Sequence, residues 1–331
     1  MTVLVTGGAG YIGSHMVWEL LDNNEDVLIV DNLTTGFEWA IPEGVKFVNA
    51  NIGDQEKMEA VIKEHKVDAI IHFAGSVVVP ESIENPLMYY QNNTGNSRNL
   101  IGAAVNTGIE KFIFSSTAAV YGNPLTEGPI SENAILNPMS PYGTSKLMTE
   151  LMLRDTAEAH DFSYVILRYF NVAGCDIKGR TGQSTEGATH LIKVACEAAA
   201  GNRSSMKIFG TDYDTKDGTC VRDFIHVGDL ANAHYEALKY IRSGGQKFTA
   251  NCGYSQGYSV REVIDTVKKV SGNEFRVIET ERRAGDIEAL TANAHRLMTR
   301  LEWEPKHNNL ETIISSALDW EKKLVTLKKS A

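Results

Sequence analysis

The sequence predicts an α/β fold, in which a Rossmann-type doubly wound parallel sheet is joined to a smaller α/β lobe that binds the substrate. Two observations predict the sheet. Short apolar segments alternate with helical patterns through the first half of the chain, and a glycine-rich turn follows the first apolar segment. Such an alternation is typical of parallel strands that helices cover on both faces. The pattern loosens after about residue 170, which predicts the second lobe.

The expected strands are rich in Val, Ile and Phe, and most are apolar on both faces. They cover residues 3–6, 27–30, 46–49, 69–73, 111–115 and 164–169. Helical periodicity predicts helices over 12–23, 141–160, 187–201, 227–242, 259–271 and 310–328. Residues 174–187 are polar and rich in glycine, so they form either an ordered substrate loop or a mobile lid. We therefore expect a dinucleotide domain over 1–170 and a substrate lobe over 171–331, with segments of the latter returning to the first domain.

Composition limits the classes of partner. The formal net charge is −10, whereas a nucleic-acid-binding protein needs a basic surface. The chain has neither an apolar run long enough to span a bilayer nor a leader, so we expect no membrane contact and a cytoplasmic location. The four cysteines are Cys175, Cys196, Cys220 and Cys252. Without a C-x-x-C pair they indicate buried thiols in a reducing compartment rather than disulfides or a metal site, and we expect no metal.

The glycine-rich turn indicates a dinucleotide site. Gly7, Gly10 and Gly13 follow the first strand and open the first helix. Glycines here allow a tight turn, close approach of a pyrophosphate and close packing of helix on sheet. The helix N-terminus, with Tyr11 and Ile12 in its first turn, offers N–H donors to the phosphates.

An acidic residue at the end of the second strand selects between NAD and NADP. Asp31 can accept hydrogen bonds from the ribose hydroxyls and repels a 2′-phosphate, although a turn or helix cap would also explain it. Asn32 follows without a nearby arginine, so NAD is the expected cofactor. The same strand ends place further residues beside the cofactor. These are Asn51, Ile52, Phe73, Ala74 and Gly75.

A second set of residues indicates the chemistry. One strand ends in hydroxyls up to Thr117, and downstream Tyr142 and Lys146 lie four residues apart, on one face of a helix. A tyrosine with a pKa near 10 is a weak base, but an ammonium, a cationic nicotinamide and a helix N-terminus all favour the phenolate. Thr117, Tyr142 and Lys146 are therefore the expected catalytic residues.

Longer motifs extend this pattern over the whole chain. They are TGGAGYIGSH at 6–15, DNLTTG at 31–36, HFAG at 72–75, YYQNN at 89–93, FIFSSTAAVYG at 112–122, SPYGTSKLM at 140–148, RYFNVAG at 168–174, DGTCVRDFIHVGDLA at 217–231 and RRAGD at 282–286. Through them the chain resembles the UDP-glucose 4-epimerase family, within the extended short-chain dehydrogenase/reductase superfamily. The resemblance implies a cytoplasmic homodimer with tightly bound NAD, which interconverts UDP-glucose and UDP-galactose through a 4-keto sugar.

The resemblance also assigns roles. Tyr142 is the implied general base, Thr117 shares the proton of the sugar 4-hydroxyl, and Lys146 binds the nicotinamide ribose. Asn92 and Phe170 are implied cofactor contacts. The implied contacts of the UDP-sugar are Thr117, Tyr142, Asn171, His190, Leu191, Arg222, Arg283, Asp286 and Leu290. A diphosphate suits the fork-shaped donors of the arginines, while a salt bridge to Asp223 or a similar acid is the alternative interpretation of Arg222.

Several positions depart from the family pattern. Thr117 replaces the usual serine, Val77 the familiar lysine and His190 the usual asparagine. Leu290 stands where some relatives have tyrosine, so we expect room for an N-acetyl group and some activity on UDP-N-acetylhexosamines.

Other functions fit the motifs less well. A C4 epimerase of another UDP-sugar remains an alternative, as do a nucleotide-sugar 4,6-dehydratase and a non-catalytic NAD-binding protein. The dehydratase would need an acid beside Thr117, where Ala118 and Ala119 stand. For the homodimer, apolar residues 101–104 and 147–153 are the expected contact.

Overall fold

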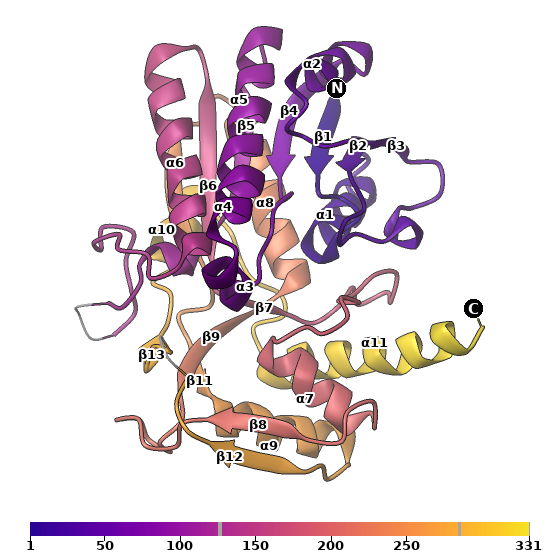
Figure 1. Cartoon of the computed structure of the whole chain (residues 1–331). Coiled ribbons are helices and arrows are strands. Elements are labelled where there is room, and N and C mark those ends of the chain that lie inside the picture. The colour runs from indigo at the N-terminus through magenta and orange to yellow at the C-terminus, as the bar shows by residue number, and fades with distance from the viewer. Residues whose placement is uncertain (125–127, 284–285, 331) are drawn as a thin grey trace.

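A seven-stranded parallel sheet forms the larger part of the molecule (Figure 1). The structure is a computed structural model that describes residues 1–124, 128–283 and 286–330. The strand order is β10-β6-β5-β4-β1-β2-β3, and every neighbouring pair is parallel. The strands are β1 (Thr2–Thr6), β2 (Asp26–Asp31), β3 (Lys46–Asn49), β4 (Val67–His72), β5 (Lys111–Thr117), β6 (Ser163–Tyr169) and β10 (Phe248–Cys252). The predicted doubly wound α/β fold is confirmed.

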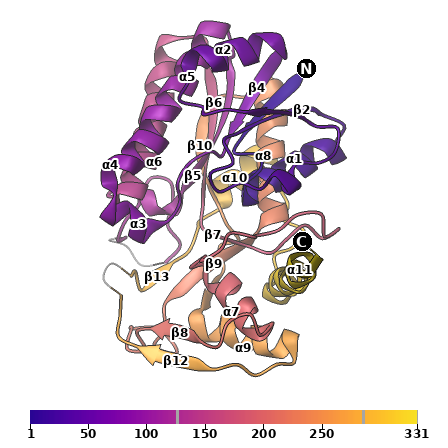
Figure 2. The same ribbon diagram turned by 45° about the vertical axis from the view of Figure 1, so that its right-hand side comes forward.

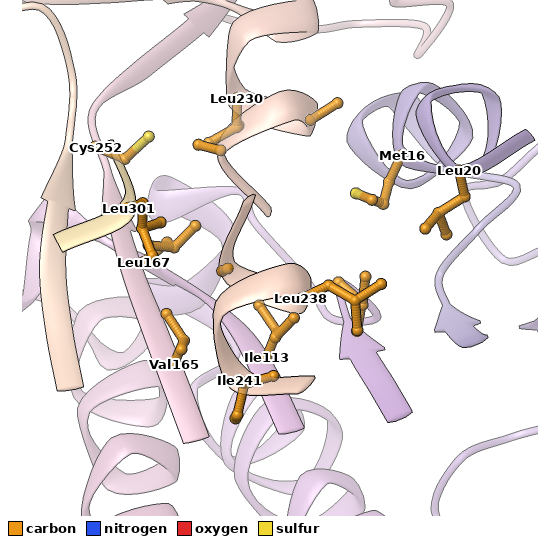
Figure 3. Packing of buried hydrophobic residues seen from close by; sticks show 14 of the residues in the cluster. Met16, Leu20, Ile113, Val165, Leu167, Leu230, Leu238, Ile241, Cys252 and Leu301 are labelled. Atoms are coloured by element: carbon orange, nitrogen blue, oxygen red, sulfur yellow. The ribbon is translucent and has the colours of Figure 1, made fainter. Parts of the chain in front are cut away.

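Helices cover both faces of this sheet because alternate strand residues point to opposite sides. In β1, Val3 and Val5 pack with α1 (Tyr11–Asp22) and α8 (Val227–Arg242), and Figure 3 shows Met16, Leu20, Leu230 and Leu238 in this layer. Leu4 points the other way. It packs in the layer that α2 (Gln55–Glu64), α5 (Asn96–Thr107) and α6 (Pro141–Ala159) cover.

The edge strand β10 comes from the second half of the chain. It pairs in parallel with β6, with Phe248 opposite Val165 and Cys252 opposite Tyr169. The sequence pattern did not predict this strand, since its apolar residues are interrupted by Thr249 and Asn251. The helix α10 (His295–Leu301) also packs here, through Leu297 and Leu301. Segments beyond residue 170 therefore complete the large sheet and its helical layer.

The smaller lobe lies below the large sheet in Figures 1 and 2. One sheet contains β7 (Asn171–Ala173), β9 (Val221–His226), β11 (Gly257–Ser259) and β13 (Ala289–Leu290), and a second pairs β8 (Met206–Phe209) with β12 (Val277–Thr280). The helices α7 (Leu191–Ala199), α9 (Val260–Ser271) and α11 (Leu310–Ser330) share one apolar cluster with them.

Most expected bounds agree with the structure within a few residues. The predicted helix ranges did not include α2, α5 and α10, nor the two short helices α3 (Val79–Glu84) and α4 (Pro86–Tyr89) and the π-helical turn η2 (Tyr90–Gly95). The two 3-10 turns η1 (Glu38–Ala40) and η3 (Ala118–Val120) also lie in segments without periodicity. All four cysteines are buried free thiols, as expected. In the described part of the chain, no helix combines the length and apolarity that a membrane span requires.

Candidate active site

The glycine turn packs against the end of β4 at distances that only glycine allows. Gly7 has a φ of +71°, and a Cβ there would lie 2.7 Å from the backbone nitrogen of Ala74. A Cβ on Gly13 would lie 2.0 Å from the Gly7 carbonyl oxygen. Gly10 precedes α1 and has no side chain with which to cap it. The first-turn N–H groups at Tyr11 and Ile12 are therefore offered to a ligand at this end of the helix.

Asp31 joins the glycine turn to the end of β2. Its carboxylate accepts the backbone N–H of Ala9 at 3.0 Å and of Leu33 at 2.8 Å. Asp31 therefore does cap the turn, as the alternative interpretation expected. This role does not exclude a ligand, since a carboxylate offers about four lone-pair sites. Asn32 is exposed at the same edge of the sheet, and its side-chain oxygen accepts the backbone N–H of Thr34.

The ends of β3 and β4 bring further predicted residues to this edge. Asn51 accepts the N–H of Gly53 at 2.8 Å, and Ile52 is buried. Phe73 packs on His234, with the ring centroids 4.8 Å apart. Ala74 lies against the glycine turn, as the close approach to Gly7 shows.

Asparagines of η2 shape the segment that follows β4. Asn92 donates to Ser76 Oγ at 2.9 Å. Its neighbour Asn93, which the sequence reasoning missed, is buried and bonds to both the N–H and the carbonyl of Ser76. Asn93 also lies beside Gly75, where a Cβ would meet its Oδ1 at 2.9 Å. Val77, in place of the family lysine, is 48% exposed.

The three predicted catalytic residues meet at the carboxyl end of β5. Ser140 caps α6 by accepting the N–H of Gly143 at 3.2 Å, and this cap fixes the first turn that carries Tyr142. The Tyr142 phenol is hydrogen-bonded to Thr117, the last residue of β5. One turn later, Lys146 Nζ donates to the carbonyl of Ser115 at 3.0 Å.

Burial determines the charge state of these groups. It raises the pKa of Tyr142 above its usual value, and the hydrogen bond from Thr117 only partly offsets this effect. Burial also lowers the pKa of Lys146 to about 8, against the carboxylate of Glu150, which raises it. In the protein alone, burial in the low-dielectric site therefore outweighs the groups that favour the phenolate, and the lowered pKa expected beside Lys146 and a cationic nicotinamide stays a prediction.

Two aromatic residues flank this group. Tyr169 lies opposite Thr117 in the β5–β6 register, and burial, together with the nearby Tyr142, raises its pKa. The sequence reasoning missed Tyr169, although it stands in the RYFNVAG segment. Phe170 is buried in a cluster between the two lobes, which we call the junction cluster. Its members are Ala118, Val120, Tyr121, Ile130, Phe170 and Ala292.

Arg222 lies in the middle of the smaller lobe's sheet. Its neighbours in register are Tyr258 of β11 and Leu290 of β13. The alternative salt bridge to Asp223 is not formed, since that buried carboxylate instead accepts the backbone N–H groups of Tyr254, Ser255 and Ala292. Within the described residues, Arg222 donates to the backbone carbonyls of residues 221 and 288. Leu290 packs on the junction cluster, which begins next to Thr117.

The other predicted substrate residues occupy three places. Arg283 pairs with Asp286, at 3.0 Å between Nε and Oδ2, and its guanidinium lies 4.5 Å from the centre of the Phe209 ring. Residues 284–285 of the RRAGD motif lie outside the described residues. Asn171 donates to the carbonyl of Asp223 at 3.3 Å.

His190 and Leu191 lie at the start of α7. His190 shares a 2.9 Å hydrogen bond with Gln183, and Leu191 packs on the apolar cluster of the smaller lobe. The contacts described for these two residues join them to that lobe rather than to Arg222, Leu290 or the catalytic group.

The glycine-rich loop after β7 is fastened to α1. The Tyr11 hydroxyl donates to the carbonyl of Gly174 at 2.6 Å, and Ser14 and Thr181 share a 2.7 Å hydrogen bond. Arg180 forms ion pairs with Asp22 of α1 and with Asp176 of its own loop. These contacts favour the ordered loop over the mobile lid.

Comparison with known proteins agrees with this geometry. Residues 3–253 match the NAD dependent epimerase/dehydratase family. A UDP-glucose 4-epimerase of Azospirillum brasilense is 55% identical over 322 residues, which are 97% of this chain and 92% of the relative.

Two solved structures have the same fold. The UDP-Glc/GlcNAc 4-epimerase of Campylobacter jejuni is 48% identical, with a TM-score of 0.85 and coverage of 97% and 99% of the two chains. The UDP-glucose 4-epimerase of Bifidobacterium longum, in complex with NAD+ and UDP, is 38% identical, with a TM-score of 0.91 and coverage of 98% of each chain.

Proposed function

The chain belongs to the UDP-glucose 4-epimerases of the NAD-dependent epimerase/dehydratase family, and we propose that it interconverts UDP-glucose and UDP-galactose with tightly bound NAD. The observation that carries the proposal is the meeting of Thr117, Tyr142 and Lys146 at the carboxyl end of the sheet that also bears the glycine turn. Ligands of doubly wound folds bind at this end of the strands.

The residues present fit NAD. The positions of Gly7 and Gly13 leave no room for a side chain, which lets a pyrophosphate approach the start of α1. Asp31 supports NAD rather than NADP, because its carboxylate suits ribose hydroxyls. We propose that Asn32, Asn51, Ile52, Phe73, Ala74, Gly75, Asn92 and Phe170 complete the contacts. In the same proposal, residues 1–170 bind the cofactor and 171–331 mainly bind the sugar nucleotide.

The proposed mechanism uses the hydroxyl groups of Thr117 and Tyr142. Tyr142, as the phenolate, accepts the proton of the sugar 4-hydroxyl through or beside Thr117, and later returns it to O4 when hydride adds to the opposite face of C4. Lys146, held by Ser115, supplies the positive charge that opposes protonation of Tyr142. Reversible transfer of the C4 hydride is the chemistry that bound NAD would supply, and its cationic ring would add to the stabilisation of the phenolate.

Substrate binding must hold the nucleotide firmly and the sugar loosely, since the sugar presents both faces in turn. We propose that Arg222 and Arg283 hold the diphosphate, with Asp286 orienting Arg283 at 3.0 Å. Asn171, His190, Leu191 and Leu290 line the rest of the site in this proposal. The apolar contacts of Leu290 suit a sugar that turns, because they fix no hydroxyl.

A second activity is supported by Leu290. Its side chain lacks the ring that a tyrosine would place against Arg222 and the junction cluster, which leaves space beside the sugar. The Campylobacter jejuni relative, at 48% identity, is a UDP-Glc/GlcNAc 4-epimerase. We therefore propose that UDP-N-acetylhexosamines are also substrates.

We further propose a cytoplasmic homodimer. Four free cysteines suit a reducing compartment. Residues 101, 103 and 104, expected at the contact, are instead buried within the subunit. Exposed apolar residues of α4 and α6 support the contact better, namely Leu87, Met88, Met148 and Leu151. Replacing Met148 and Leu151 by glutamate should give a monomer in light-scattering measurements, and an unchanged mass would argue against this surface.

The test of the main proposal is an assay without added cofactor. Purified protein should convert UDP-galactose into UDP-glucose, because it retains its own NAD through purification. Denaturation should release about one NAD per subunit. A protein that holds NAD but leaves UDP-galactose unchanged would refute the proposed reaction.

A further inference from the structure

Helix α6 carries a third polar residue on the face that bears Tyr142 and Lys146. Glu150 follows Lys146 by four residues, so the three side chains stand on successive turns. Each contacts a different residue at the end of β5: Tyr142 meets Thr117, Lys146 donates to Ser115, and Glu150 accepts from Ser116 Oγ at 2.5 Å. These three contacts hold α6 against the end of β5.

Glu150 forms a salt bridge with a buried arginine. Arg168 of β6 donates to both carboxylate oxygens, and each side chain of the pair is no more than 6% exposed. Arg168 also donates to the Tyr121 hydroxyl at 3.0 Å. That hydroxyl in turn donates to the side-chain oxygen of Asn251 of β10 at 2.6 Å. The network thus connects α6 with three strands of the sheet. Burying an ion pair costs desolvation energy, and apolar side chains of similar volume often serve stability as well.

We propose that Glu150 is a positioning residue of the active site, which places a carboxylate one helical turn from Lys146 and aligns the end of β5 with Tyr142 through Ser116. The proposal rests on the proposed epimerase function. Glu150 acts through Lys146 and Ser116, whereas Tyr142, Thr117 and Lys146 act on the ligands.

In the described part of the chain, Glu150 is the acidic residue near Lys146. The groups that face the ammonium from β4 and β5 are His72, the Phe114 ring and the Ser115 carbonyl. Burial, with Lys146 nearby, lowers the pKa of His72 to about 3, so this imidazole stays neutral at assay pH. Gly75 approaches from the cofactor side and carries no charge. On α6, Tyr142 is the titratable group one turn before Lys146.

The test compares Glu150→Gln with wild type over pH 6 to 10. Glutamine keeps an acceptor for Ser116 and removes the charge that raises the pKa of Lys146. The alkaline limb of kcat/KM should therefore move to lower pH by about one unit, a loss of about tenfold at pH 9. Glu158→Gln is the matched control, since Glu158 lies on the same helix and pairs with Lys247 at the surface. It should reproduce the wild-type profile.

A double variant separates positioning from folding. Glu150→Gln leaves the Arg168 cation buried without its partner, whereas Glu150→Gln with Arg168→Met removes both charges. The double variant should recover thermal stability but keep the shifted alkaline limb. A return to the wild-type profile would show that the pair serves the fold alone and would overturn the proposal.

A second readout does not depend on turnover. The pH at which Lys146 reacts half-maximally with acetic anhydride, read by mass spectrometry of its peptide, should fall in the double variant. An unchanged value would refute the role of Glu150 even if the protein were not an epimerase. Wild-type protein inactive on UDP-galactose but with the expected labelling shift would instead refute the proposed function.

Discussion

Tyr142 is the residue on which the proposed reaction most depends, because it is the group placed to take the proton from the sugar. Tyr142→Phe removes the hydroxyl that bonds to Thr117 and keeps the buried ring. Turnover of UDP-galactose should fall by about 10²- to 10⁴-fold, the usual contribution of a general base. UDP binding, measured by calorimetry, should be unchanged, since Arg222 and Arg283 are untouched. Turnover within threefold of wild type would remove Tyr142 from this role.

Leu290 offers a test of substrate choice at a single side chain. Leu290→Tyr places a ring beside Arg222, in the space proposed for an N-acetyl group. Turnover of UDP-N-acetylgalactosamine should fall at least tenfold relative to UDP-galactose, because overpacking a confined site costs about 1 to 3 kcal/mol. Leu290→Met, of similar volume, is the control and should retain both activities. Equal loss on the two substrates would contradict the assignment.

At the residue scale, the sequence predicted the groups with a chemical signature and missed those that support them. Tyr142, Lys146 and Thr117 could be found from spacing and order, and the structure brings them together. Asn93 and Glu150 gave no such signal, because their roles depend on partners far along the chain. The sequence does not reveal how deeply the Tyr142 phenol is buried, so it did not predict that burial raises the pKa of this group in the protein alone.

At the scale of elements, the strands of the large sheet were predictable because buried parallel strands are continuous apolar runs. The strand β10 was not, since Thr249 and Asn251 interrupt its pattern and the buried Asn251 is satisfied only by tertiary contacts. The short helices α3 and α4 were missed for another reason. Each spans fewer than two turns, too few for a helical period to appear.

The loop after β7 gives a prediction about an element. Arg180 links this loop to Asp22 of α1 and lies 4.3 Å from the centre of the Trp18 ring. The next residue of this loop, Thr181, shares a 2.7 Å hydrogen bond with Ser14 in the first turns of α1, beside the proposed pyrophosphate site. Arg180→Ala should loosen this contact through the loop and speed the release of NAD roughly fivefold, for a loss of about 1 kcal/mol. The measurement is the NAD content per subunit during dialysis. Arg203→Ala, which breaks a pair with Glu197 in the smaller lobe, is the control and should retain NAD as wild type does.

At the scale of the whole molecule, the two lobes meet through few but varied contacts. The junction cluster joins the end of β5 to Ala292, and a backbone bridge pairs Ile130 with the same residue. The pairing of β7 with β9 continues the chain directly from the large sheet into the smaller lobe. This closeness follows from the fold and explains how Leu290 comes to lie near Thr117, which spacing along the sequence could not show.

Four buried histidines link the stability of the whole chain to pH. Burial, as the largest effect, lowers the pKa values of His15 and His234 to about 4 and those of His72 and His226 to about 3. Between about pH 6.5 and 4, the unfolded chain binds protons that the native protein excludes. Stability therefore falls as the pH falls through this range, by about 1.4 kcal/mol per pH unit for each excluded proton.

The contribution of one of these protons can be tested at His234. Its Nδ1 bonds to the carbonyl of Leu230 at 2.8 Å, while its buried Nε2 has no partner among the described residues. His234→Phe should reduce the pH slope of the unfolding free energy, measured by urea titration from pH 7 to 5, by about 1 kcal/mol per unit on average. Ile113→Val is the control: it loses core packing without a titrating group, so it should lower the unfolding free energy equally at every pH. A slope for His234→Phe equal to that of wild type would mean that the imidazole already takes up its proton in the native protein.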